Sequence, residues 1–182
     1  MRASRILPIA LLAGALAARL LAAQAPTSGW RAEFLDIFSG DEAKYLQLAE
    51  ATPWEKYAYR PGAGVRSTCE VFLHIAGANY RRSGNIGTKA PANVDVKNIE
   101  KCPESKARVM ATLKASFAHF RAAVVAMPDN AAEDTFKLFG QDMTKRGFLT
   151  GIAEHTGEHL GQSIAYARVN GIVPPWSAKQ GS

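Results

Sequence analysis

Residues 144–175 read TKRGFLTGIAEHTGEHLGQSIAYARVNGIVPP, and this stretch decides the fold. Side chains suited to one buried face recur in it at intervals of three or four residues, which is the period of a helix. They are Phe148, Ile152, His155, His159, Gln162 and Tyr166. Gly171 follows where a left-handed cap would end a helix, and Pro174 and Pro175 prevent continuation. The pattern predicts a helix from about Thr144 to Asn170.

Three earlier stretches have the same helical period and complete the fold prediction. They run from about Arg31 to Ala51, from Ser67 to about Arg82, and from Pro103 to Met127. The second begins with Ser67-Thr68-Cys69-Glu70, which is the pattern of a capping box. No stretch alternates convincingly as a strand does. We therefore predict an all-α chain that forms a four-helix bundle.

The connection between the second and third helices, residues 84–102, is long enough to cross the bundle. It can reach about 60 Å at ~3.3 Å per residue, whereas the second helix is only about 25 Å long. The second and third helices can therefore run parallel, which would place Cys69 and Cys102 at the same end. We expect these two cysteines to form a disulfide.

The first 25 residues differ from the rest and resemble a secretory signal peptide. Two arginines precede an uncharged run, Ile6 to Ala18, and small residues follow it. Cleavage after Ala25, Ala23 or Ala17 fits the pattern, and an uncleaved anchor is the alternative. We expect residues 26–182 to form one exported domain, periplasmic or secreted, without stable membrane insertion after cleavage.

Removal of the leader also halves the net positive charge. The formal net charge is +6, and the leader carries three arginines and no acidic residue, so +3 remains after cleavage. A charge of this size gives no reason to expect nucleic-acid binding.

The two histidines of H-T-G-E-H, His155 and His159, are candidate metal ligands. Four residues apart, they project from one side of a helix and can share an ion. A proton-transfer pair and two ordinary helix residues are the alternatives. Two ligands make a weak site, and His74, within the apolar stretch VFLHIAGA, is the third candidate. His119 lies beside the apolar stripe of its helix, so we expect it on a flank or at the surface.

The neighbours of these histidines receive weaker assignments. Gln162 follows His159 by three residues, so it could orient a ligand or a water, and Tyr166 could do the same or simply pack. Glu154 and Glu158 point about 100° away from the histidines and are expected in solvent. No catalytic acid, base or nucleophile is identified.

Three stretches together resemble the DinB-like (DinB/YfiT) superfamily: EKYAYRPGAGVRSTCEVFLHIAGANY, LKASFAHFRAAV and EHTGEHLGQSIAYARVNGIVPPWS. The resemblance implies a bundle with up-down-down-up topology and a divalent metal, often nickel or zinc, on His74, His155 and His159. It also implies a homodimer. Related proteins include transferases and isomerases that use bacillithiol or mycothiol, which are cytosolic thiols that an exported protein would not easily meet.

Two functions follow as hypotheses. The first is a metal-dependent hydrolase or transferase that acts on an unidentified small molecule. The second is a non-catalytic metal-binding or stress-response protein. Imidazole ligands accept nickel, zinc, iron and manganese, so the residues alone do not choose among these metals.

Overall fold

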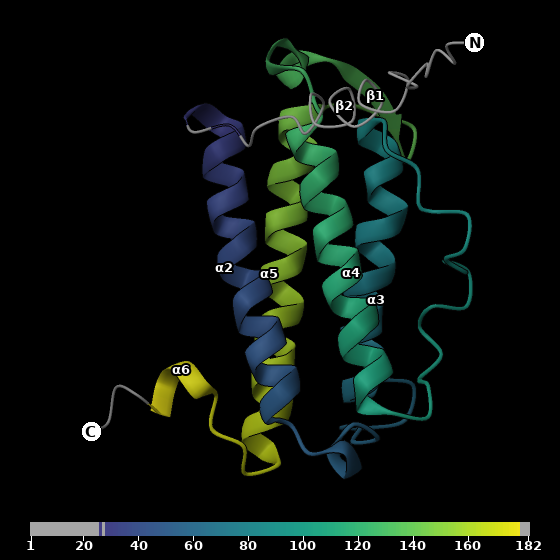
Figure 1. Ribbon diagram of the computed structural model, residues 1–182, viewed down its shortest axis with the longest axis vertical. Coiled ribbons are helices and arrows are strands. Elements are labelled where there is room, and N and C mark those ends of the chain that lie inside the picture. Colours follow the sequence, from purple (N-terminus) through teal and green to yellow (C-terminus); the bar gives the residue numbers. More distant parts are fainter. Residues whose placement is uncertain (1–25, 27, 179–182) are drawn as a thin grey trace, which may run out of the picture.

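Four long helices lie side by side and make up most of the molecule (Figure 1). The computed structural model describes residue 26 and residues 28–178, so the predicted leader lies outside the described residues. The long helices are α2 (Gly29–Ala51), α3 (Thr68–Ser83), α4 (Lys106–Val125) and α5 (Lys145–Val169). A short helix, α6 (Pro175–Ala178), and three 3-10 turns, η1 (Trp54–Lys56), η2 (Gly84–Ile86) and η3 (Asp129–Glu133), complete the helical part. The prediction of a mostly helical, all-α chain is confirmed. Within the described residues, no helix is both long and apolar enough to cross a membrane.

The long helices do not simply alternate in direction along the chain, because the two middle helices run parallel to each other. In Figure 1, α2 and α5 run in one direction, and α3 and α4 run in the opposite one. The connection from α3 to α4 returns along the outside of the molecule to the end where α3 began. There Cys69 and Cys102 are joined in a disulfide, with their Cα atoms 5.8 Å apart.

The core between the helices combines aliphatic side chains with a cluster of aromatic rings. Phe38 is fully buried, and its ring centroid lies 5.1 Å from that of Phe117 and 5.2 Å from that of Phe120. Tyr45 is also fully buried and donates a hydrogen bond of 2.8 Å to the backbone oxygen of Thr156. Each such side chain contributes roughly 1.5–3 kcal/mol through burial. These contacts fix α2 against both α4 and α5.

Local signals set most of the helix ends. The capping box is present: the amide of Glu70 donates to Ser67 Oγ at 3.2 Å, and the amide of Ser67 donates to Glu70 Oε2 at 2.7 Å. At the far end of α5, Gly171 has φ 76°, and the Ile172 amide donates to the Ala167 oxygen at 2.9 Å. This is the predicted left-handed cap.

The predicted start of the third helix was wrong by three residues. The helix begins at Lys106 rather than at Pro103, because Ser105 is the residue that caps it. The Ser105 hydroxyl accepts from the Arg108 amide at 3.4 Å. Serine in this position offers the free amides an acceptor that proline lacks.

A β-hairpin before α5 is absent from the prediction. Strands β1 (Thr135–Leu138) and β2 (Gln141–Thr144) pair antiparallel through a turn at Phe139 and Gly140. Both turn residues have positive φ, 50° and 84°. A hairpin turn of this kind usually carries Asn or Asp before the glycine, and each strand is only four residues long, so periodicity did not indicate the two strands.

Candidate metal centre

Three histidines from two helices meet in the groove between α3 and α5. One ring nitrogen from each of His74, His155 and His159 can be chosen so that all three lie within 4.8 Å of one another. His74 Nε2 lies 3.3 Å from His155 Nε2. The ring centroids of His155 and His159 are 4.7 Å apart, as are those of His74 and His159. The three predicted ligands are therefore brought together.

Hydrogen bonds on the opposite ring nitrogens orient two of these imidazoles. His74 Nδ1 donates to Glu100 Oε1 at 2.9 Å. His159 Nδ1 donates to Gln162 Oε1 at 2.8 Å, and Gln162 Nε2 in turn donates to the Tyr166 hydroxyl at 2.8 Å. A neutral imidazole that donates from Nδ1 keeps a lone pair on Nε2. Both Nε2 atoms are thus prepared to accept an ion.

Burial favours the neutral form of two imidazoles, His155 and His74. The pKa of His155 is lowered to about 3, mainly by burial and also by the positive charge of Arg82 and by the neighbouring histidines. Burial also lowers the pKa of His74, and it outweighs the opposing effect of the Glu100 carboxylate. Neutral imidazole is the form that binds a metal, so these shifts favour coordination near neutral pH.

The geometry fits a transition-metal ion. Zinc–nitrogen bonds of 2.0–2.1 Å in a tetrahedral site place neighbouring ligand nitrogens about 3.4 Å apart. The 3.3 Å between the Nε2 atoms of His74 and His155 is close to this value. Three protein ligands with two oriented Nδ1 atoms are also the donor set of open, catalytic metal sites.

The fourth histidine lies elsewhere. His119 on α4 is half-buried; its Nε2 lies 2.9 Å from Ser83 Oγ and its ring lies against Tyr80, with centroids 5.2 Å apart. The flank position expected for it agrees with this placement. His119 can therefore serve as a control residue outside the cluster.

Two further expectations about neighbouring residues agree with the structure. Gln162 touches His159, and Tyr166 is buried behind it with its hydroxyl at the Gln162 amide. Glu154 and Glu158 are exposed. All three histidines are only partly buried, at the edge of the core.

Sequence reasoning missed Glu100, which is the partner of His74. It lies on the connection before α4 and also pairs with Arg66 at 3.1 Å and Arg81 at 3.2 Å. The expected disulfide could have predicted the position of Glu100. If Cys102 is fixed to Cys69, then Glu100, two residues earlier, lies near the turn of α3 that carries His74.

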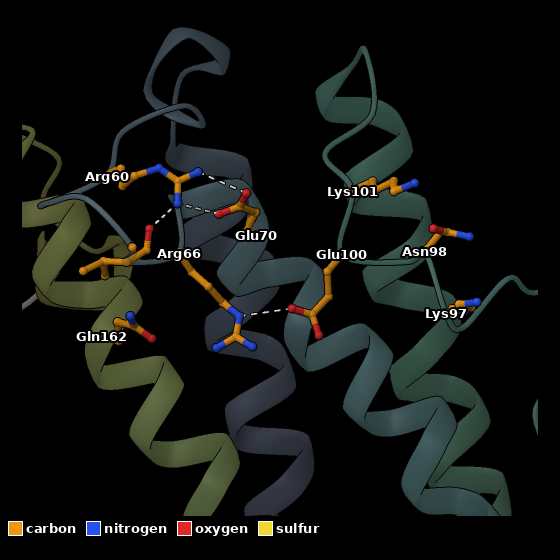
Figure 2. A pocket seen from close by; sticks show the side chains of 10 residues that line it. Arg60, Arg66, Glu70, Lys97, Asn98, Glu100, Lys101 and Gln162 are labelled. Carbon is orange, nitrogen blue, oxygen red and sulfur yellow. Dashed lines mark hydrogen bonds and ion pairs between the residues drawn. The ribbon is translucent and has the colours of Figure 1, made fainter.

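A charged pocket of about 750 Å³ adjoins the centre on the side of Glu100 and Gln162. Figure 2 shows two ion pairs in it, Arg60 with Glu70 and Arg66 with Glu100. Lys97 and Lys101 on the connection before α4 add positive charge. None of the three clustered histidines lines this pocket, which therefore borders the Nδ1 side of the centre.

Comparison with known proteins places the chain in a family. The sequence profile of the DinB superfamily matches residues 37–163, which is more than half of the chain. This chain belongs to the DinB superfamily. The matched region contains His74, His155, His159 and Gln162, and it covers most of all four long helices.

Solved structures of DinB-like proteins share the fold. A protein from Bacillus cereus is 19% identical with a TM-score of 0.68, and the match covers 78% of this chain and 93% of that one. A protein from Bacillus subtilis is 20% identical with a TM-score of 0.63 and the same coverage. A protein assigned to the DinB family from Exiguobacterium sibiricum is 22% identical, with a TM-score of 0.59 and coverage of 80% and 95%. At these identities the likeness concerns the fold alone. No curated protein matches the chain.

Proposed function

We propose that this DinB superfamily protein binds one divalent metal on His74, His155 and His159 and uses it in hydrolysis or group transfer on a small molecule. The observation that carries the proposal is the convergence of the three ring nitrogens, two of them with the opposite nitrogen already hydrogen-bonded. When bound, a divalent ion would supply Lewis-acid chemistry and acidify a coordinated water or thiol. Nickel and zinc are the metals we expect first, with iron and manganese as further candidates.

The chain's own residues would orient the centre. Glu100 accepts the Nδ1 proton of His74 and so raises the basicity of the Nε2 atom. Gln162 does the same for His159 through its amide oxygen, and its amide nitrogen is fixed by Tyr166. Among the described residues that touch the cluster, no side chain takes an obvious role as general base. We therefore propose no catalytic residue beyond the ligands and their partners.

Elemental analysis of the purified protein, combined with three single variants, tests the proposal. We expect about one equivalent of divalent metal in the wild type, and its loss in His74→Ala and His155→Ala. His119→Ala is the matched control, because His119 lies outside the cluster, and it should keep the metal. Wild-type protein that contains no metal, and gains no stability from added zinc or nickel, would contradict the proposal.

Removal of the metal distinguishes the enzyme from the non-catalytic alternative. The buried apolar core contains none of the three histidines, so we expect the metal-free protein to stay folded by circular dichroism. Loss of the fold on chelation would instead favour a structural metal in a binding or stress-response protein.

We also propose that the protein is exported to the periplasm or outside the cell. The signal-peptide pattern of residues 1–25 and the disulfide between Cys69 and Cys102 support this location. The paired directions of the long helices support the up-down-down-up bundle as the topology. The homodimer, the small-molecule substrate and the lack of nucleic-acid binding stay predictions.

A further inference from the structure

A second pocket opens directly onto the histidine cluster. It has a volume of about 490 Å³ and lies between the second half of α3, the first half of α5 and the β-hairpin. His74 and His155 line it, in contrast to the charged pocket of Figure 2, which none of the three clustered histidines lines. A molecule in this second pocket would therefore face the centre itself.

Most of the lining is apolar. The apolar side chains come from α3, from the hairpin with β2, and from α5: Ala78, Leu138, Phe139, Met143, Phe148 and Ile152. Phe139, at the tip of the hairpin, is 99% exposed. A fully exposed phenylalanine at the rim of an apolar pocket is a surface that a bound apolar group would cover. The lining thus selects a ligand with a hydrophobic body.

Two arginines line the same pocket and differ in their partners. Arg81 is paired with Glu100 at 3.2 Å. Arg82 is half-buried, and within residues 28–178 no carboxylate lies in ion-pair distance of its guanidinium. Its positive charge acts on His155, where it helps to lower the pKa. A half-buried cation without a counter-charge is unfavourable, and a ligand anion would compensate it.

The backbone of α5 leaves room for such a ligand. Gly147 and Gly151 line the pocket, one helical turn apart. A Cβ added at Gly151 would meet no atom within 4 Å, so the space beside this glycine is open to a ligand.

We propose that this pocket binds an organic carboxylate with a hydrophobic body, its carboxylate on Arg82 and its reacting group toward the ring nitrogens of His74 and His155. The inference rests on the proposed function, since it names the substrate class of that centre. A guanidinium pairs with a carboxylate through two hydrogen bonds. One unpaired cation in an apolar pocket matches a single negative charge better than the double charge of a phosphate monoester.

Binding of 3-phenylpropanoate and of the neutral 3-phenylpropanamide, measured by calorimetry on the full chain, tests the pocket. Both metal-free and zinc-loaded protein are used, because a carboxylate could also bind the metal alone. We expect millimolar or tighter binding of the acid to both forms, about tenfold or more tighter than the amide. Arg82→Gln should remove this preference, whereas Arg108→Gln, an exposed arginine on α4, should keep it.

A second pair of variants tests the space rather than the charge. Gly151→Leu places a side chain in the pocket and should abolish binding. Gly157→Leu makes the same change at an exposed position of α5, also without a neighbour within 4 Å, and should leave binding intact. Thermal melting identifies any variant that does not fold. If one pair of variants is lost in this way, the other pair still tests whether the ligand binds in this pocket.

The outcomes separate this inference from the proposed function. If the wild type binds metal but shows no preference for the acid, or if Arg82→Gln and Gly151→Leu bind it as the wild type does, the inference is wrong and the proposed function stands. Binding of the acid to the zinc-loaded form alone means metal ligation and also overturns it. If no metal binds at the histidines, the proposed function fails whatever the acid does.

Discussion

The carboxylate of Glu100 orients the ring of His74 in the proposed metal centre. It is the acceptor of the Nδ1 hydrogen bond and is held by Arg66 and Arg81 from two sides. We expect Glu100→Ala to weaken metal binding about 10–100-fold, because the ring loses its fixed orientation and part of its basicity. Competition with a chelator of known affinity measures the change. Glu104→Ala is the control, since Glu104 is exposed and forms an ion pair with Arg108, away from the histidines. Equal affinities in both variants would contradict the role of Glu100.

The capping box gives a prediction for pH at the residue scale. Hydrogen bonds from Arg60 and Ser67 hold the pKa of Glu70 below its usual value of 4.5. The stability that the Glu70 carboxylate provides is therefore complete above about pH 4.5 and is lost as the pH falls through the lower pKa of the folded state. We expect Glu70→Ala to cost about 1 kcal/mol at neutral pH. Glu70→Gln keeps a capping side chain, so urea titrations should show a smaller loss and a weaker decline of stability in acid. An unchanged acid dependence in Glu70→Gln would argue against this account.

At the scale of the elements, the helical period of the sequence predicted the four long helices, each of which packs one apolar face into the core. Helices α2 to α5 could be predicted because each has apolar residues on one buried face. The contact between Phe38 of α2 and Phe117 of α4 is an example. The start of α4 was misplaced because proline and serine both signal helix starts, and only the observed hydrogen bond to Ser105 decides between them. The hairpin could not be predicted, because Phe139 occupies a turn position with positive φ, where glycine, asparagine or aspartate is usual.

The hairpin turn also yields a prediction in which stability and binding change in opposite directions. Phe139 has φ 50°, a left-handed conformation that asparagine adopts more easily. Phe139→Asn should raise the free energy of unfolding by up to about 1 kcal/mol through relief of this strain. The same change removes an aromatic ring from the rim of the second pocket, so binding of 3-phenylpropanoate should weaken. Calorimetric melting and ligand titration on one sample measure both effects. A variant that is less stable than the wild type would show that the ring supports the hairpin instead.

At the scale of the whole molecule, the three histidines that cluster were predictable and their surroundings were not. His155 and His159 follow from spacing within one helix, and His74 follows from the apolar stretch around it. Glu100, Arg82 and the two pockets depend on how the connection before α4 and the hairpin fold over the groove between α3 and α5. The position of these segments depends on contacts between residues far apart in the sequence, which no local sequence pattern indicates. The disulfide was the one sequence feature that could have linked the connection to the centre.

That disulfide connects overall stability to the metal centre. It closes a loop with a sequence separation of 33 residues, and removing a cross-link of this length costs about 4 kcal/mol in the chain-entropy model. We expect the double variant Cys69→Ala and Cys102→Ala to lose about this much stability in denaturant titrations. Because Cys102 lies two residues after Glu100, the freed connection should also hold Glu100 less firmly on His74. Metal affinity should therefore fall, though less than in Glu100→Ala.

Reduction of the wild type with dithiothreitol should reproduce both changes without any substitution, provided that the reductant is removed before metal is added. If stability falls while metal affinity stays at the wild-type value, the ion pairs with Arg66 and Arg81 hold Glu100 in place by themselves. The disulfide would then stabilise the fold without supporting the centre.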